Sequence, residues 1–168
     1  MDKKPVKVVQ YVNTGEVSSG GIETILNSGA IGSCVVITAF DSKKKMGAMA
    51  HIMLPGRASS KNQVNATRYA ANALEELLRQ MKNRDVNTED LEICLVGGAN
   101  VLKRENDIIG EDNLNSIKKW LTEEQFKIKA ESIGGFERRT VIFDVEMGSN
   151  FLTVGDSKQE TLWQTASK

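Results

Sequence analysis

Residues 34–55, CVVITAFDSKKKMGAMAHIMLP, consist of two apolar runs joined by a short polar connection. The first run, at 34–40, is nearly continuous in apolar residues, which is typical of a strand buried on both faces. The second run, at 48–54, ends before Pro55 and also has strand character. The connection DSKKKMG, at 41–47, is short enough for a hairpin. The two runs are therefore predicted to lie side by side in one sheet.

Working outward, the chain adds further strands and two amphipathic helices. Segments rich in β-branched residues predict strands at 6–12, 91–96, 128–131 and 140–145. Small or apolar residues recur at helical spacing from Ala70 to Met81, which predicts a helix there. A second stripe within 111–126 contains Leu114, Ile117 and Leu121. These elements predict a single layered domain of the α/β or α+β class.

Composition excludes several classes of protein. The chain has 168 residues, of which 40% are hydrophobic and 26% charged, so it can form one folded core and is unlike a disordered chain. Lys and Arg number 22, as do Asp and Glu, so there is no basic excess to bind nucleic acid. No apolar run reaches the roughly 18–20 residues of a membrane span, and the N-terminus lacks the apolar core of a secretory signal. We therefore expect a cytoplasmic protein with reduced thiols and no membrane insertion.

The chain is expected to form one domain over residues 1–154, followed by a polar, loosely held tail over 155–168. The prolines are Pro5 and Pro55, and no Gly/Ser-rich linker or internal repeat divides the sequence. Heptads are lacking as well, so there is no reason to expect an obligate oligomer, and a monomer is the expectation.

Cys34, Cys94 and His51 are the candidates for nucleophilic or acid–base chemistry. Two cysteines and one histidine cannot form a disulfide framework, nor a four-ligand zinc site without carboxylates. Cys94, in LEICLVGG, is expected to be a small buried hydrophobe. Cys34 follows SGAIGS, a Gly-rich turn whose N–H groups can point at a developing oxyanion. Burial preferences alone favour a core role for both Cys34 and His51, but a hairpin that pairs them strengthens the alternative of thiol catalysis.

Several motifs in order resemble those of the CheD family, the chemoreceptor glutamine deamidases of bacterial and archaeal chemotaxis. The motifs are SGAIGSCVVITAFD at 28–41, KKKMGAMAHIMLPG at 43–56, RYAANALEELL at 68–78, VGGANV at 96–101, IGEDN at 109–113, GG at 134–135 and RRTVIFDVEMG at 138–148. The resemblance extends from about residue 6 to residue 154. It implies a layered α/β sandwich similar to that of toxin deamidases of the cytotoxic-necrotising-factor type.

The resemblance also implies roles for three residues. Cys34, in the GSC motif, corresponds to the nucleophile of the family, and His51, in the AHxMLP motif, corresponds to its histidine. The third polar residue of the family, usually a Thr six positions before the cysteine, corresponds to Ser28. Its hydroxyl can hydrogen-bond to the imidazole, but it lacks the methyl group that restrains a threonine rotamer, so His51 is expected to be held more loosely.

The implied activity is hydrolysis of glutamine side chains to glutamate on the cytoplasmic helices of chemoreceptors (methyl-accepting chemotaxis proteins). It proceeds through a glutamyl thioester and needs no metal or organic cofactor. The same chemistry predicts methylesterase activity on receptor glutamyl esters, and the family further implies a CheC-type CheY-phosphate phosphatase as a partner.

Two alternatives remain open at the level of the sequence. One is a CheD-like adaptor that binds receptors and the phosphatase with little deamidase activity. The other is a general cysteine hydrolase of small amides. An enclosed pocket at the cysteine would favour the small-amide hydrolase, whereas an open cleft would favour the deamidase.

Overall fold

The two central apolar runs form neighbouring strands of one sheet in the computed structural model, which describes residues 3–167. Strand β4 (Val35–Asp41) pairs antiparallel with β5 (Met46–Ile52), and Val36 lies opposite His51. All residues of β4 are buried, as its continuous apolar character predicted. The predicted hairpin is thus confirmed.

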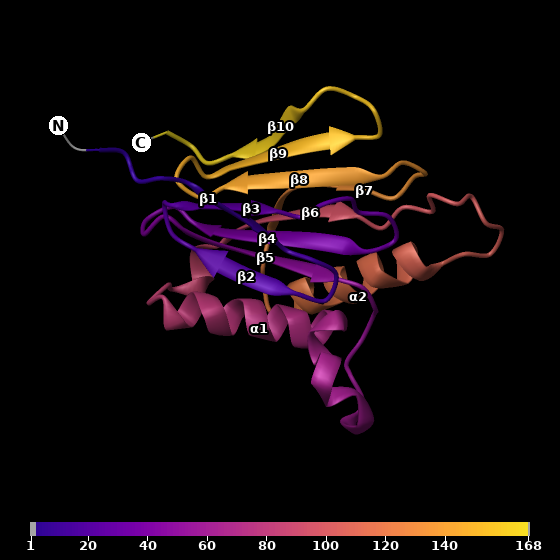
Figure 1. Cartoon of the computed structure of the whole chain (residues 1–168). Coiled ribbons are helices and arrows are strands. Elements are labelled where there is room, and N and C mark those ends of the chain that lie inside the picture. Colours follow the sequence, from indigo (N-terminus) through magenta and orange to yellow (C-terminus); the bar gives the residue numbers. More distant parts are fainter. Residues whose placement is uncertain (1–2, 168) are drawn as a thin grey trace.

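The strands form two five-stranded sheets (Figure 1). The sheet that contains β4, here called the central sheet, has the order β2-β5-β4-β6-β7. Its other strands are β2 (Val17–Gly20), β6 (Glu92–Gly97) and β7 (Ile128–Ile133). The outer sheet has the order β1-β3-β8-β9-β10. Its strands are β1 (Val8–Tyr11), β3 (Thr24–Asn27), β8 (Arg139–Asp144), β9 (Ser149–Val154) and β10 (Glu160–Gln164).

Helices α1 (Ala70–Asn83) and α2 (Ile109–Glu123) lie together on one side of the strands in Figure 1. Two 3₁₀ helices, η1 (Ser60–Arg68) and η2 (Thr88–Asp90), flank α1 in the sequence. Both predicted helices are confirmed, with α2 beginning two residues before the predicted start. No helix within residues 3–167 is long and apolar enough to cross a membrane.

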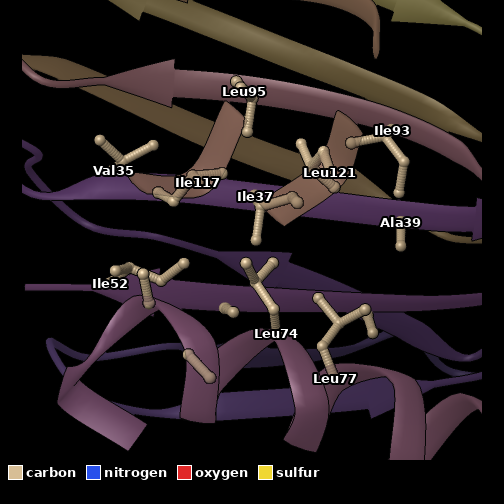
Figure 2. Close-up of a cluster of buried hydrophobic side chains, with 14 of the residues drawn as sticks. Val35, Ile37, Ala39, Ile52, Leu74, Leu77, Ile93, Leu95, Ile117 and Leu121 are labelled. Carbon is tan, nitrogen blue, oxygen red and sulfur yellow. The ribbon is translucent and has the colours of Figure 1, made fainter. Parts of the chain in front are cut away.

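Two hydrophobic clusters fill the spaces between three layers, which are the helices, the central sheet and the outer sheet. The first lies between the helices and the central sheet, where Ile37 of β4 meets Leu74 of α1 and Ile117 of α2 (Figure 2). The second, here called the inter-sheet core, includes Val36 and Phe143. Because successive strand residues point to opposite faces, β4 supplies alternate side chains to each cluster. The result is the predicted single layered domain, of the α+β class.

Four strands were not predicted, and one of them corrects an expectation. Strand β10 lies in the segment expected to be a loosely held tail, where it pairs antiparallel with β9. Leu162 of β10 packs against the inter-sheet core. A loose tail is therefore the wrong description of residues 160–164, because sheet pairing holds a segment whose own composition is polar. The domain boundary at residue 154 stays a prediction.

Candidate active site

Cys34 lies at a bend that leads into β4, half-buried against the inter-sheet core. The carbonyl groups of this bend are fixed by neighbouring segments. The Gly32 carbonyl accepts a hydrogen bond from the Ala99 N–H at 3.0 Å, and the Cys34 carbonyl accepts one from the Gly98 N–H at 2.8 Å. The turn that follows β6 therefore determines how the bend presents Cys34.

Two N–H groups of the same bend are left free. Within residues 3–167, those of Gly32 and Ser33 donate no hydrogen bond, whereas the Cys34 N–H faces its own thiol. Free backbone N–H groups beside a nucleophile are suited to stabilise a negatively charged oxygen. The oxyanion role that the Gly-rich turn suggested stays a prediction.

His51 is almost fully buried, with 3% of its surface exposed. Its Nδ1 lies 2.9 Å from the carbonyl oxygen of Val12, just beyond β1. Because a carbonyl only accepts hydrogen bonds, we infer that Nδ1 carries the proton of the neutral ring. Nε2 then has the free lone pair that a general base requires.

Cys34 and His51 lie on the same face of the central sheet. His51 is opposite Val36, and Cys34 precedes Val36 by two residues. Like Val36, Cys34 packs against the inter-sheet core. Diagonal cross-strand neighbours have Cα atoms about 7–8 Å apart, which long side chains can bridge. The hairpin therefore brings together the two residues expected from the sequence, although no hydrogen bond joins the thiol to the imidazole among the residues that the structure describes.

Ser28 reaches the imidazole through its backbone. Its backbone raises the pKa of the His51 ring, because a nearby carbonyl favours the protonated form, although the ring hydrogen bond seen among the described residues is the one to Val12. The Ser28 hydroxyl has other partners: it donates to the Gly29 carbonyl at 2.7 Å and accepts from the Val141 N–H at 2.9 Å. The Ser28 hydroxyl thus has partners other than the expected imidazole, and the catalytic role of Ser28 stays a prediction.

Burial sets the protonation states of the pair. It raises the pKa of the Cys34 thiol above the usual value, and the effects of the Thr14 side chain and of the Cys34 backbone N–H oppose this only in part. Burial lowers the pKa of the His51 ring, against the opposing effects of the Val12 and Ser28 carbonyls and of Glu16. At neutral pH the resting pair is therefore a thiol beside a neutral imidazole.

Thr14 is a site residue that was not predicted from the sequence. It belongs to a turn after β1 that makes hydrogen bonds with both the carbonyl and the N–H of His51. The Gly15 N–H donates to the His51 carbonyl at 2.8 Å, and the His51 N–H donates to the Glu16 carbonyl at 3.0 Å. The sequence signal for the turn is Gly15, whose φ of 84° favours glycine. Nothing in the sequence links this turn to Cys34.

Cys94 is excluded as a competing nucleophile. It lies in β6 with 1% of its surface exposed, and burial raises its pKa to about 12. A thiol of this kind is not ionised at neutral pH and does not meet solvent. The expectation of a small buried hydrophobe is confirmed.

The surface beside the bend is open. A depression of about 350 Å³ is lined by Gly32 and Ser33 together with Leu102 and Arg138, but not by Cys34 or His51. Across residues 3–167, no group of three or more His, Cys, Asp or Glu side chains is placed to hold a metal ion. The geometry is that of a thiol and an imidazole at the edge of the inter-sheet core.

Comparison with known proteins identifies relatives. The family model described as CheD chemotactic sensory transduction matches residues 53–153. A protein of Chlorobium luteolum named "Probable chemoreceptor glutamine deamidase CheD" is 39% identical over 156 residues, which cover 93% of this chain and 77% of the relative. The "Chemoreceptor glutamine deamidase CheD" of Thermotoga maritima is 34% identical over 118 residues, covering 70% and 74%. A Clostridium kluyveri protein named "Probable chemoreceptor glutamine deamidase CheD" is 31% identical over 160 residues, covering 92% and 96%.

Proposed function

The chain belongs to the CheD family, and we propose that it hydrolyses glutamine side chains of chemoreceptors to glutamate, with Cys34 as nucleophile and His51 as general base. The observation that carries the proposal is the placement of both residues on one face of the β4–β5 hairpin. The names of the relatives give the substrate class. The N–H groups of Gly32 and Ser33, which donate no hydrogen bond within residues 3–167, and the burial of Cys94 support the same assignment.

The first half of the reaction forms a thioester. Nε2 of His51 accepts the proton of the Cys34 thiol as Sγ attacks the side-chain amide carbon of glutamine. The carbonyl oxygen becomes an oxyanion, which the free N–H groups of the bend stabilise. The imidazolium then returns its proton to the amide nitrogen as the C–N bond breaks. Ammonia leaves, and the glutamyl group stays on Sγ.

The second half consumes one water molecule. His51 removes a proton from the water as its oxygen attacks the thioester carbon. The tetrahedral intermediate collapses, the C–S bond breaks, and the imidazolium returns the proton to Sγ. The products are a glutamate side chain and ammonium, and the thiol and imidazole are regenerated. The Val12 carbonyl holds the ring tautomer throughout, because its bond to Nδ1 leaves Nε2 as the proton carrier.

The depression beside the bend does not enclose Cys34, which supports a polypeptide substrate over a free small amide. It is lined by an exposed apolar side chain, Leu102, at 64% exposure. An enclosed pocket, as a small-amide hydrolase needs, would bury most of its ligand. A helix presenting a glutamine is the kind of substrate that an open face admits.

Several finer expectations remain part of the proposal. Attack on a glutamyl methyl ester would follow the same steps with methanol as the leaving group, so methylesterase activity on receptors is expected. A CheC-type phosphatase as second partner, a cytoplasmic location and a monomeric state are also expected from the family and the composition. The adaptor alternative, with binding but little deamidation, predicts no conversion of glutamine.

The test is mass spectrometry of a purified chemoreceptor cytoplasmic fragment incubated with the full chain, with released ammonia measured in parallel. The variants are Cys34→Ala, His51→Ala and, as the matched thiol control, Cys94→Ala. We expect site-specific conversion of Gln to Glu by the wild type and Cys94→Ala, and none by the other two. Binding of the receptor without conversion by the wild type would favour the adaptor, and conversion by Cys34→Ala would exclude the proposed nucleophile.

A further inference from the structure

We propose that Asn113 is a positioning residue that holds the Cys34 bend and the end of the His51 strand in fixed relation. Asn113 lies in α2, outside the β4–β5 hairpin that carries the reacting groups. The inference deepens the proposed function and rests on it. It assigns a task to the IGEDN motif, which the reaction itself does not use.

One amide nitrogen joins the two segments. Nδ2 of Asn113 donates to the Ser33 carbonyl at 3.0 Å and to the Met53 carbonyl at 3.1 Å. Ser33 immediately precedes Cys34, and Met53 follows His51 by two residues. The two hydrogen bonds of a single group therefore span the segment of the nucleophile and the segment of its base.

The chemistry of this position specifies an amide. Both partners are carbonyl oxygens, so the group between them must supply two N–H donors from one atom. An aspartate has none, and its negative charge would face two carbonyl dipoles. The amide orientation follows from the same partners, because its oxygen cannot bond to either carbonyl.

The close approach of α2 makes a short side chain sufficient. A Cβ added to Gly110 would lie 2.5 Å from the carbonyl oxygen of Gly98, so the first turn of α2 touches the backbone after β6. Gly98 in turn donates its N–H to the Cys34 carbonyl. Helix α2 thus packs against the segment that holds the Cys34 carbonyl. The side chain of Asn113 extends beyond that segment to the Cys34 bend.

The other end of the Asn113 amide is buried without a partner among the described residues. Asn113 is fully buried, with 0% of its surface exposed, and its Oδ1 has no hydrogen-bond partner within the described chain. An unpaired buried acceptor costs free energy that an apolar side chain of similar volume would avoid. What the amide offers in return is the pair of hydrogen bonds that fixes the two carbonyls. Since Asn113 is inaccessible, it cannot touch a substrate, and its effect must pass through Cys34 and His51.

The experiment compares Asn113→Ala, Asn113→Asp and Asn113→Leu in the full chain, with Asn115→Ala as control. Asn115 is exposed and lies on the same helix. The aspartate variant keeps the side-chain volume and the leucine variant, although larger, keeps the branched shape, so neither leaves an empty cavity. Deamidation of the receptor fragment gives kcat and KM, and alkylation of Cys34 by iodoacetamide between pH 6 and 9 gives a reading that needs no receptor.

We expect kcat to fall about 10- to 100-fold in all three Asn113 variants while KM changes less than about two-fold, because small displacements of reacting groups cost this much. Alkylation near neutral pH should fall to the rate of His51→Ala, and Asn115→Ala should match the wild type. Unchanged kcat and an unchanged alkylation profile in folded variants, with only a lower melting temperature, would overturn the proposal. If the wild type deamidates nothing, the alkylation profiles still decide the positioning role, so the two failures are distinguishable.

Discussion

Gly97 lies directly against the backbone of Cys34. A Cβ added to Gly97 would lie 2.3 Å from the Cys34 carbonyl oxygen and 2.7 Å from the side chain of Ile31. Gly97 also has a φ of 118°, in the region that favours glycine. The last residue of β6 therefore needs to be glycine for β6 to approach the nucleophile bend.

The first prediction contrasts this glycine with a second one in the core. Gly97→Ala should lower the free energy of unfolding by about 1–3 kcal/mol through strain and overpacking, and it should also lower kcat by displacing Cys34. Gly47→Ala would place a Cβ 2.5 Å from the Phe143 ring, at the opposite end of β5 from His51, and should lower stability alone. Urea unfolding and deamidation assays well below the melting temperature separate the two effects. Equal losses of kcat in both variants would contradict the prediction.

The second prediction concerns pH. Burial lowers the pKa of His51, so the neutral ring that accepts the thiol proton persists below the usual value of about 6.5. Burial raises the pKa of Cys34, so the thiol stays protonated until pH exceeds its usual range. We therefore expect kcat/KM to be flat near neutrality, with its acid limb below pH 6.5. Rapid alkylation of Cys34 at pH 6 would instead indicate a preformed thiolate–imidazolium pair and would contradict this assignment.

The third prediction separates the side chain of Ser28 from its backbone. Ser28→Ala removes the acceptor of the buried Val141 N–H and should cost about 1–3 kcal/mol of stability. The carbonyl that faces His51 remains, so kcat of the folded protein should change less than about two-fold. Ser28→Thr keeps the hydroxyl and serves as the control in thermal unfolding and deamidation assays. A large loss of kcat in a well-folded Ser28→Ala variant would show that Ser28 contributes to catalysis through its hydroxyl and not only through its carbonyl.

The fold was predictable where burial dictates the residue pattern. Strands β4 and β6 are mostly apolar because they lie inside the central sheet, and α1 shows its buried stripe in the sequence. Strand β2 reads VSSG, and β10 reads ETLWQ with a mostly exposed pattern. Such segments become strands because a neighbouring strand offers hydrogen bonds. Their own residue patterns therefore do not predict a strand.

The candidate site likewise contains residues that the sequence predicted and contacts that it did not. Cys34 and His51 are close in sequence, and a short hairpin sufficed to predict that their strands lie side by side. Asn113 and the Ser33 carbonyl are 80 residues apart, and their contact depends on how α2 packs on the turn after β6. The contact of the imidazole with the Ser28 carbonyl was also hidden, because a backbone group leaves no signature in the identity of the residue.

The last prediction concerns Thr14, whose side chain opposes the rise in the pKa of the Cys34 thiol that burial causes. Thr14→Val keeps the shape of the side chain but removes the hydroxyl, so the pKa of Cys34 should rise further. Because one hydrogen bond contributes about 0.5–1.5 kcal/mol, alkylation of Cys34 by iodoacetamide at fixed pH should slow by about 2- to 12-fold. Thr14→Ser keeps the hydroxyl and should react at close to the wild-type rate. If the valine and serine variants slow equally, the contact is one of packing, and the hydroxyl has no part in setting the reactivity of the nucleophile.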